Sequence, residues 1–293
     1  MPELPEVESV RRSLLPYLPG RVIEEAVVHH SKVLIFPTPQ EFVECLRGAR
    51  FERLERRGKL LIFQLPPGVL LVHLGMTGQI TFRDPGRADT PFERHPHTGL
   101  ERTLQHPLDQ HTHISLHFSD GCALLYRDIR KFGKWRLIRR DNPRLQNELA
   151  RVGTDPLTED WQFEPFFQAV TRSDRAIKAI ILDQQVSAGV GNIYADEALF
   201  VAGIRPEVRG KKLSRPRLKK LFKAIPEVLQ KGLKYGGTSF SDYVDADGKK
   251  GTNQESLLVY GRYGQPCYQC RQTLLRTTVA QRTSTWCKVC QKA

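Results

Sequence analysis

Residues 184–194, with the sequence QQVSAGVGNIY, join two apolar helical patterns, AIKAIILD on one side and NIYADEALF on the other. Gly189 and Gly191 allow a tight turn in which the backbone can approach another molecule closely. Asn192 is a favourable N-cap, and the free N–H groups at the start of the second helix suit a phosphate. An ordinary turn between two packed helices has the same pattern. The segment therefore predicts two helices and a sharp turn, with phosphate binding as one of two interpretations.

The sequence on both sides of this turn is helical in pattern. Apolar residues recur at helical spacing in WQFEPFFQAVT, RAIKAIILDQQ and SRPRLKKLFKAIPEVLQKGLKYGG. A charged stretch precedes them, and a Gly-rich polar segment at 236–256 follows them. A domain boundary is expected where the composition changes. We therefore predict a linker at 141–156 and a helical domain over 157–256.

Four of the six cysteines lie in the last 27 residues, as the pairs Cys267/Cys270 and Cys287/Cys290. Each pair has the spacing Cys-x2-Cys, and sixteen residues separate the pairs, which is typical of a zinc ribbon or finger. Four thiolates close a tetrahedral site with no position for substrate, so the zinc would be structural. Two disulfides or four unrelated thiols are the alternative. We predict a zinc finger over 257–293 that opens with a strand, LLVYGRYG.

The first half of the chain has a different pattern, with short alternating or continuous apolar runs between Arg21 and Ile138. Gly, Pro and Asp turns separate these runs, which indicates an antiparallel β-sandwich of about 120 residues. Before them, apolar residues at 7, 10, 14, 15 and 18 predict a helix with Pro5 in its first turn. The predicted fold is α+β, with this sandwich and its flanking helices as an N-terminal domain over 1–140.

The charge balance indicates a polyanionic partner. Lys and Arg number 45 against 32 Asp and Glu, so the formal charge is +13. Nucleic acid leads the possible partners. The longest apolar runs are far shorter than the roughly 20 residues that span a bilayer, and the N-terminus lacks the apolar stretch of a secretory signal. We therefore expect no membrane association and a cytoplasmic location.

The N-terminal sequence MPELPE carries groups suited to covalent chemistry. Removal of the initiator methionine would expose the secondary amine of Pro2, and an α-amino group titrates at about pH 8, well below lysine. Such an amine can attack a sugar C1′ and form an iminium. Glu3 could shuttle protons at the sugar, while Glu6 could hold the terminus in place. By itself, a Pro-Glu start is also a common way to begin a helix.

Five segments together resemble the formamidopyrimidine-DNA glycosylases, which are bacterial enzymes of base excision repair. They are MPELPEVE, HLGMTG at 73–78, DIRKFG at 128–133, AGVGNIYADEALF at 188–200 and the terminal cysteine pattern. The segments occur in the family order and extend over nearly the whole chain. The resemblance implies a β-sandwich domain, a domain with a helix-two-turn-helix motif, and a zinc-finger β-hairpin. It also implies double-stranded DNA with oxidised bases as the partner of a monomeric enzyme.

The resemblance assigns roles to the chemical groups. Pro2 is implied as the Schiff-base nucleophile and Glu3 as the acid that protonates the sugar ring oxygen or the base. Lys59, in RRGKLL, is implied as the proton donor for β-elimination and as a phosphate contact. Arg282, in AQRTSTWC, is implied to grip the phosphates beside the lesion and to act in δ-elimination. The implied activity is that of a DNA glycosylase and abasic-site lyase that cleaves the strand by β,δ-elimination.

A further set of residues is implied to contact DNA. A base inside a duplex must be rotated out before a nucleophile can reach it. By resemblance, Met76 and Phe132 wedge the base stack, and Arg130 hydrogen-bonds the orphaned cytosine. Asn192 is implied as a phosphate contact and His111 as a second DNA contact.

The Gly-rich segment at 236–254 corresponds to the family's loop that closes over flipped 8-oxoguanine through backbone amides. Thr238, Ser239 and Tyr243 are its candidate contacts. Because the endonuclease VIII group begins with Pro-Glu-Gly and generally lacks this loop, an oxidised purine is the expected substrate. A preference for oxidised pyrimidines is the alternative within this class, and a non-catalytic DNA-binding protein is the alternative outside it.

Two departures from the family pattern concern turns and loops. The glycine that commonly follows the second cysteine is Arg271 here. The polar segment at 84–110 is longer than usual and contains His95, His97 and His106. A second metal site there is one interpretation, but without fixed spacing or a carboxylate partner a solvated loop is the better one.

Overall fold

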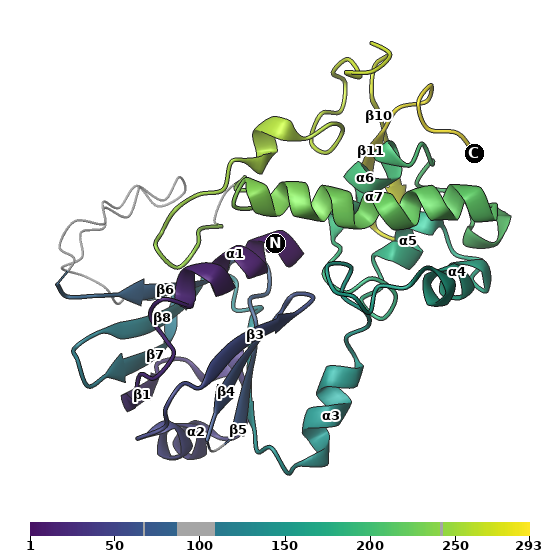
Figure 1. Cartoon of the computed structure of the whole chain (residues 1–293). Helices are drawn as coiled ribbons and strands as arrows, with labels where there is room; N and C mark the ends of the chain where they lie inside the picture. Colours follow the sequence, from purple (N-terminus) through teal and green to yellow (C-terminus); the bar gives the residue numbers. More distant parts are fainter. Residues whose placement is uncertain (67, 87–108, 241–242) are drawn as a thin grey trace. The chain divides into compact units, whose positions relative to one another are not determined.

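A computed structural model describes residues 1–66, 68–86, 109–240 and 243–293 (Figure 1). The chain divides into two compact units. The first contains Met1–Leu149 and Tyr235–Thr252, and the second contains Ala150–Lys234 and Asn253–Ala293. The three histidines His95, His97 and His106 lie outside the described residues. Within the described ranges, no helix is both long and apolar enough to cross a membrane.

The first unit contains two packed β-sheets, which confirms the predicted sandwich. A four-stranded sheet has the order β1-β7-β8-β6, and a five-stranded sheet has the order β2-β9-β5-β4-β3. All neighbours are antiparallel except β2 and β9, which are parallel. The bounds are β1 (Ile23–Val28), β2 (Leu34–Phe36), β3 (Arg53–Arg57), β4 (Leu60–Leu65), β5 (Gly68–His73), β6 (Gly78–Arg83), β7 (Thr112–Phe118), β8 (Ala123–Asp128) and β9 (Lys134–Ile138).

Apolar side chains from both sheets meet in one core. Phe63 and Val72 of one sheet lie in the same buried cluster as Ile114 and Leu124 of the other. Strands β4 and β5 are buried on nearly every residue, as their continuous apolar runs predict. The unit also contains the helix α2 (Pro39–Leu46) and the short 3-10 helix η1 (Ser31–Val33).

The N-terminal helix α1 (Leu4–Leu14) is fixed by its first turn. Glu3 is its N-cap, and Glu3 and Glu6 form a capping box with Pro5 in the first turn. One face of the helix buries Val7, Val10 and other apolar side chains in the core of the sandwich. The residues predicted to carry the chemistry therefore lie at the start of a helix that is anchored by packing.

The segment at 235–252 belongs to the first unit by its contacts, whereas the sequence pattern placed 236–254 with the helical domain. Its Ala246 carbonyl accepts from the Phe82 N–H at 3.0 Å, and the Ala246 N–H donates to Ser13 Oγ at 2.9 Å. Tyr243 and Ala246 also join the core of the sandwich. These long-range contacts explain the difference, because a local composition pattern does not reveal them.

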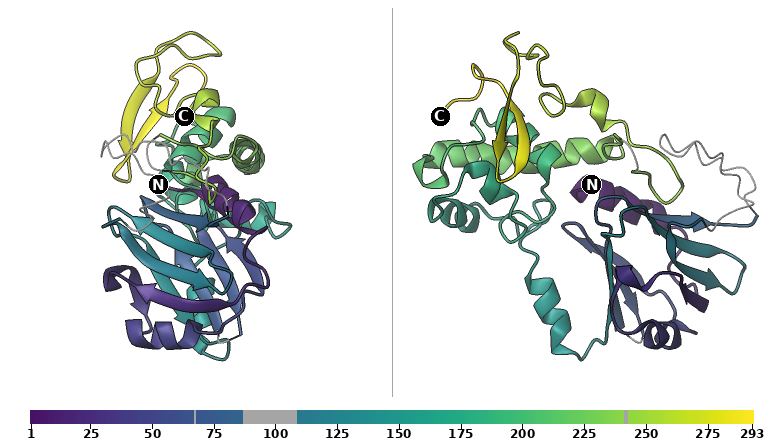
Figure 2. Two further views of the ribbon diagram at one scale, coloured as in Figure 1. Left: turned by 90° about the vertical axis from the view of Figure 1, so that its left-hand side faces the viewer. Right: turned by 180° about the vertical axis from the view of Figure 1, so that it is seen from behind.

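The second unit is mainly helical and carries the cysteine hairpin. Helix α6 packs against both α7 and β11, and the strands β10 and β11 form the hairpin (Figure 2). A Cβ at Gly232 of α7 would lie 2.4 Å from the Tyr194 hydroxyl, so only glycine allows this close packing. The bounds are α4 (Phe163–Thr171), α5 (Ile177–Ile181), α6 (Asn192–Val201), η2 (Gly210–Lys212), α7 (Arg215–Lys234), η3 (Asn253–Ser256), β10 (Leu275–Val279) and β11 (Arg282–Trp286).

Two local predictions differ from the structure. Within the predicted linker, residues Pro143–Ala150 form the helix α3. The predicted strand LLVYGRYG at 257–264 is wrong, because this segment forms bends and turns. The buried Glu197 carboxylate accepts the backbone N–H groups of Leu258, Val259 and Tyr260 at 2.8–2.9 Å. The Glu197 side chain of α6 therefore accepts the backbone N–H groups that would otherwise pair with the carbonyl groups of a neighbouring strand.

Candidate active site

The carboxylate of Glu6 organises the N-terminus. The Glu6 side chain is 1% exposed, and its Oε2 accepts the Glu3 N–H at 2.8 Å. Its Oε1 accepts the Thr238 N–H at 2.7 Å. Pro2 and Glu3 are both buried. One carboxylate thus links the backbone of the predicted acid, Glu3, to the predicted capping segment.

Lys59 lies in the turn between β3 and β4 and is only 8% exposed. The preceding residue, Gly58, has a φ of 55°, which favours glycine. Arg56 donates through Nη1 to the Gly58 carbonyl at 2.9 Å and through Nε to Glu8 Oε2 at 2.9 Å. Arg56 therefore ties the turn that carries Lys59 to helix α1, a role that sequence reasoning missed although the arginine precedes the lysine in RRGK.

The environment of this turn shifts two ionisation equilibria. Burial opposes ionisation of Glu8, but hydrogen bonds from Arg11, Arg12 and Arg56 outweigh it and lower the pKa of Glu8 to about 2. Burial lowers the pKa of His73 to about 4, and the positive charges of Lys59, Lys134 and Arg136 add to this effect. His73 is therefore neutral at physiological pH, and its Nδ1 accepts the Gly75 N–H at 3.0 Å.

Met76, Arg130 and Phe132 lie together although their loops are more than fifty residues apart in sequence. The Arg130 guanidinium contacts Met76 Sδ at 3.1 Å and lies 4.6 Å from the centre of the Phe132 ring. Met76 is 37% exposed and Phe132 is 47% exposed. Two large apolar side chains flanking a cation are thus presented to solvent, an arrangement that suits insertion between stacked bases.

His111 directly precedes β7 and is held through its backbone. Its N–H donates to Asp109 Oδ1 at 3.0 Å, and its carbonyl accepts the Asp128 N–H at 2.9 Å. Asp128 directly precedes the loop that carries Arg130 and Phe132, so the described structure connects His111 to that loop.

In the second unit, a hydrogen bond joins the Asn192 side chain to the backbone at the start of β11. The N-cap of α6 is Gly191, and Asn192 is the first helical residue, so the predicted N-cap is displaced by one position. Asn192 Nδ2 donates to the Thr283 carbonyl at 3.0 Å. Arg282, the exposed residue before Thr283, begins β11. The predicted phosphate contacts Asn192 and Arg282 are therefore brought to one place.

A buried ion pair supports this junction, and sequence reasoning missed it. Lys178 Nζ donates to Asp196 Oδ1 at 2.7 Å and to the same Thr283 carbonyl at 2.9 Å, and both side chains are at most 1% exposed. The second oxygen of Asp196 accepts the Thr285 N–H at 2.9 Å. The one sign of this ion pair in the sequence is a lysine within the apolar pattern AIKAIILD. The pattern indicates that the lysine is buried, but it does not indicate its partner.

The predicted capping segment is held by its own polar groups. Tyr243 is 8% exposed, and its hydroxyl donates toward the Glu6 carbonyl at 3.2 Å and the Gly236 carbonyl at 3.0 Å. Ser239 Oγ donates to the Tyr243 carbonyl at 2.9 Å and accepts the Gly251 N–H at 3.0 Å. In this structure Thr238, Ser239 and Tyr243 are therefore engaged within the first unit. Residues 241–242 of the segment lie outside the described part.

The four terminal cysteines can hold a metal ion. Their sulfur atoms all lie within 4.8 Å of one another, with Cys267 and Cys290 at 3.8 Å and Cys270 and Cys287 at 3.3 Å. Zn–S bonds of about 2.3 Å in a tetrahedron separate the sulfurs by about 3.8 Å, so the cluster has a suitable size. Among the described residues, this is the one group of His, Cys, Asp and Glu side chains with such geometry.

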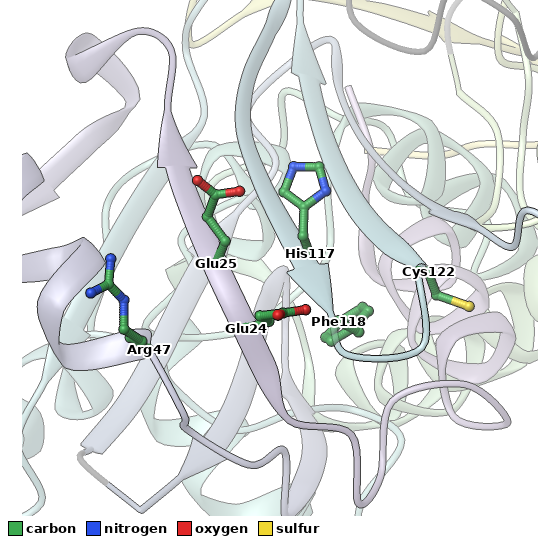
Figure 3. Close-up of a pocket in the computed structure, with 7 residues that line it drawn as sticks. Glu24, Glu25, Arg47, His117, Phe118 and Cys122 are labelled. Atoms are coloured by element: carbon green, nitrogen blue, oxygen red, sulfur yellow. The ribbon is translucent and has the colours of Figure 1, made fainter.

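A pocket of about 480 Å³ opens elsewhere on the first unit (Figure 3). None of the residues predicted to act on DNA lines it. Figure 3 shows Glu25 and His117 on neighbouring strands and Cys122 at the following turn. The lining residues are Glu24, Glu25, Arg47, His117, Phe118, Gly121 and Cys122.

Comparison with known proteins assigns the family. Residues 1–135 match the formamidopyrimidine-DNA glycosylase N-terminal domain, and residues 152–244 match the formamidopyrimidine-DNA glycosylase H2TH domain. The chain is 40% identical over 292 residues to a formamidopyrimidine-DNA glycosylase of Desulfitobacterium hafniense, covering 99% of this chain and 100% of that one. It is 39% identical to the corresponding protein of Heliobacterium modesticaldum, with 100% of both chains covered.

Comparison with solved structures supports the same family. A complex of Lactococcus lactis Fpg with abasic-site DNA has a TM-score of 0.85 and 32% identity, covering 99% of this chain and 100% of that one. The same protein with DNA containing N7-benzyl-Fapy-dG has a TM-score of 0.86 and 32% identity, with 100% of both chains covered. The protein described here therefore belongs to the formamidopyrimidine-DNA glycosylase family.

Proposed function

We propose that this protein is a DNA glycosylase and abasic-site lyase of base excision repair that removes oxidised purines, 8-oxoguanine and formamidopyrimidines, from duplex DNA. The main support for this proposal is the structure of the N-terminus. There Glu6 holds the backbone of Glu3, the residue next to Pro2, at the start of a buried helix. Membership of the family supports it. Because its proposed substrate is bacterial DNA, the protein would act at the nucleoid in the cytoplasm. One chain contains all the proposed catalytic and binding groups, so a monomer would be sufficient.

The proposed chemistry begins when removal of Met1 frees the Pro2 amine. The amine attacks C1′ of the damaged nucleotide, and the bond from C1′ to the base breaks as the base takes up a proton. Glu3 protonates the ring oxygen, the sugar opens, and an iminium links Pro2 to C1′. The nearly neutral pKa of an α-amino group supplies enough free base for the attack.

Strand cleavage then follows from the acidity of the iminium. Loss of a C2′ proton breaks the C3′–O bond and releases the phosphate on that side. Loss of a C4′ proton then breaks the C5′–O bond and releases the second phosphate. Lys59 acts as proton donor in the first elimination, and Arg282 assists the second by binding the adjacent phosphates. Water finally hydrolyses the iminium and regenerates the Pro2 amine.

The remaining residues bind the DNA in its distorted form. Met76 and Phe132 fill the gap left by the flipped nucleotide, and Arg130 hydrogen-bonds the unpaired cytosine. Asn192 and His111 contact the backbone. The segment at 236–254, through Thr238, Ser239 and Tyr243, closes over the flipped base.

We further propose that the cysteine cluster binds one zinc ion. The four sulfur ligands and their distances fit this metal. Bound zinc would have a structural role, because four thiolates leave no position for substrate. Cys267, Cys270, Cys287 and Cys290 would then fix the hairpin that presents Arg282.

Oxidised pyrimidines are a second candidate substrate class. One similar structure, with a TM-score of 0.85 and 33% identity, is a Lactococcus lactis Fpg complex with DNA containing an oxidised pyrimidine. We therefore expect weak activity on such bases beside the main activity on purines.

The test is an excision assay on end-labelled duplexes that contain one 8-oxoguanine, one formamidopyrimidine, one thymine glycol or no lesion. We expect the purine lesions to give a one-nucleotide gap with phosphates at both ends, and Glu3→Gln to lower base excision by at least about 100-fold. Faster excision of thymine glycol would overturn the substrate assignment. Tight DNA binding without cleavage of any lesion or abasic duplex would overturn the enzymatic proposal.

A further inference from the structure

The buried carboxylate of Asp128 accepts hydrogen bonds from both loops that carry the exposed Met76, Arg130 and Phe132. Asp128 ends β8 and is 0% exposed. Its Oδ1 accepts the Thr77 hydroxyl at 2.5 Å and the Arg130 N–H at 3.2 Å. Hydrogen bonds to an ionised carboxylate are roughly twice as strong as neutral ones, so these contacts are strong constraints.

The second oxygen of Asp128 continues the same arrangement. Oδ2 accepts the Gly133 N–H at 2.7 Å and the Tyr126 hydroxyl at 3.0 Å. The backbone is also used, because the Asp128 carbonyl accepts from His113 Nε2 at 2.7 Å and its N–H donates to the His111 carbonyl. Asp128 thus connects the β5–β6 loop, the β8–β9 loop and the start of β7.

The two loops pack closely around Tyr126. A Cβ at Gly133 would lie 1.6 Å from the Tyr126 hydroxyl, and a Cβ at Gly78 would lie 2.8 Å from it. Burial, with Asp128 nearby, raises the pKa of Tyr126, so this hydroxyl remains protonated and can donate. Gly75, with a φ of 70°, would also place a Cβ 2.6 Å from the Gly133 backbone nitrogen. The two loops therefore meet without room for additional atoms.

We propose that Asp128 is a positioning residue that makes Met76, Arg130 and Phe132 act as one preformed wedge. Thr77 follows Met76, Gly133 follows Phe132, and Arg130 donates its own backbone N–H, so each wedge residue is within one position of a bond to Asp128. The inference rests on the proposed function of these three residues in filling the DNA gap. It adds the group that sets their spacing before DNA binds.

Preformation has a kinetic consequence that simple fold stabilisation lacks. A fixed wedge loses little side-chain and loop entropy when it enters the duplex, whereas loose loops must be ordered at that step. The cost arises only with duplex substrates that require the gap to be filled. Cleavage of an abasic site in single-stranded DNA uses Pro2 and the elimination groups without the wedge.

Two substitutions of Thr77 test this with little risk to folding. Thr77→Val is isosteric and removes two hydrogen bonds, the one that the hydroxyl donates to Asp128 and the one that it accepts from the Arg130 N–H at 3.1 Å. Thr77→Ser retains the hydroxyl. Thr81→Val, four residues along on β6, removes a hydroxyl as a matched control. Asp128→Asn is the stronger variant, because its amide nitrogen would face a donor that the carboxylate accepts.

The readouts are excision of 8-oxoguanine opposite cytosine in a duplex, abasic cleavage in a single strand, and fluorescence of 2-aminopurine placed beside the lesion. For Thr77→Val we expect kcat/KM on the duplex to fall about tenfold, because the hydrogen bonds of the hydroxyl to Asp128 and from Arg130 are lost. The rate at which 2-aminopurine fluorescence rises should decrease by the same factor. The rate of cleavage of the single-stranded abasic substrate should stay within about twofold of wild type. Thr77→Ser and Thr81→Val should stay within about twofold throughout, while Asp128→Asn should lose about 100-fold on the duplex.

Equal losses on duplex and single-stranded DNA would overturn the proposal, because Asp128 would then only stabilise the fold. Unchanged duplex kinetics in Thr77→Val and Asp128→Asn would overturn it as well. Failure of the wild-type protein on both substrates would instead reject the proposed function, and the two failures are therefore distinguishable.

Discussion

The two units hold their functional side chains in different ways. In the first unit, single buried carboxylates each accept several hydrogen bonds, as Glu6 does at the N-terminus and Asp128 does at the exposed loops. In the second unit, strand β11, which begins at Arg282, is hydrogen-bonded to Asp196 of α6 and belongs to the hairpin that the cysteine cluster is proposed to fix. The apolar cluster around the cysteines is small, and two of the cysteines are among its members. The first unit is thus preformed by its own fold, whereas we propose that zinc fixes the hairpin.

The largest expected effect follows from metal removal. Complete chelation should unfold the hairpin, displace Arg282 and lower excision from 8-oxoguanine duplexes by at least about 100-fold. The first unit should keep its structure, because its core contains no cysteine ligand. NMR spectra and excision rates before chelation, after chelation and after zinc is restored measure both effects. Native NMR signals from the hairpin after complete chelation would show that the hairpin, like the first unit, folds without metal.

The next effect concerns the turn that carries Lys59. Arg56→Lys keeps the charge but cannot donate to Glu8 and the Gly58 carbonyl in the same geometry. We expect kcat for cleavage of an abasic site to fall about tenfold with little change in KM. Arg53→Lys, on the same strand, is the matched control and should behave as wild type. Wild-type kcat in Arg56→Lys would show that the turn is positioned by other contacts.

A smaller effect is expected in the pH dependence of folding stability. The pKa of Glu8 is lowered to about 2 in the folded chain, below its usual value of 4.5. Its stabilising contribution is therefore complete above about pH 4.5 and is lost as the pH falls toward 2. Urea unfolding of wild type and Glu8→Gln across this range measures the difference. Parallel stability curves for the two proteins would exclude Glu8 as the source of this pH dependence.

The smallest effect concerns Arg271, which departs from the family's usual glycine. Its φ of 66° lies in the left-handed region, where a side chain costs about 1 kcal/mol. Arg271→Gly should therefore stabilise the metal-bound hairpin by about 1 kcal/mol, seen as a higher midpoint in thermal unfolding. Arg271→Ala loses the same charge without relieving the backbone and should give no gain. Equal stabilisation by both variants would indicate a charge effect.

Local patterns predicted most of the fold. Apolar runs located the strands, and the helical stripe located α1 and its first turn. The failures involve groups that meet over long sequence distances. The segment at 257–264 is irregular because Glu197 accepts its N–H groups, and residues 235–252 join the first unit through Phe82 and Ser13.

The candidate site divides in the same way. The resemblance named Pro2, Lys59 and Arg282, which stand in recognisable motifs. The groups that hold them, such as Arg56 and Lys178, could not be found from sequence. Their roles depend on which carbonyl each side chain reaches, and that is set by strand register and helix packing.

The most direct test of the account is borohydride trapping with a duplex that contains one 8-oxoguanine opposite cytosine, followed by peptide mapping of the crosslink. We expect a covalent adduct at Pro2 in a chain that has lost Met1. We also expect zinc-depleted protein to form the same adduct with a single-stranded abasic oligonucleotide, because the groups proposed to form the Schiff base belong to the first unit. An adduct at Lys59 or another lysine, or one on a chain that retains Met1, would contradict it.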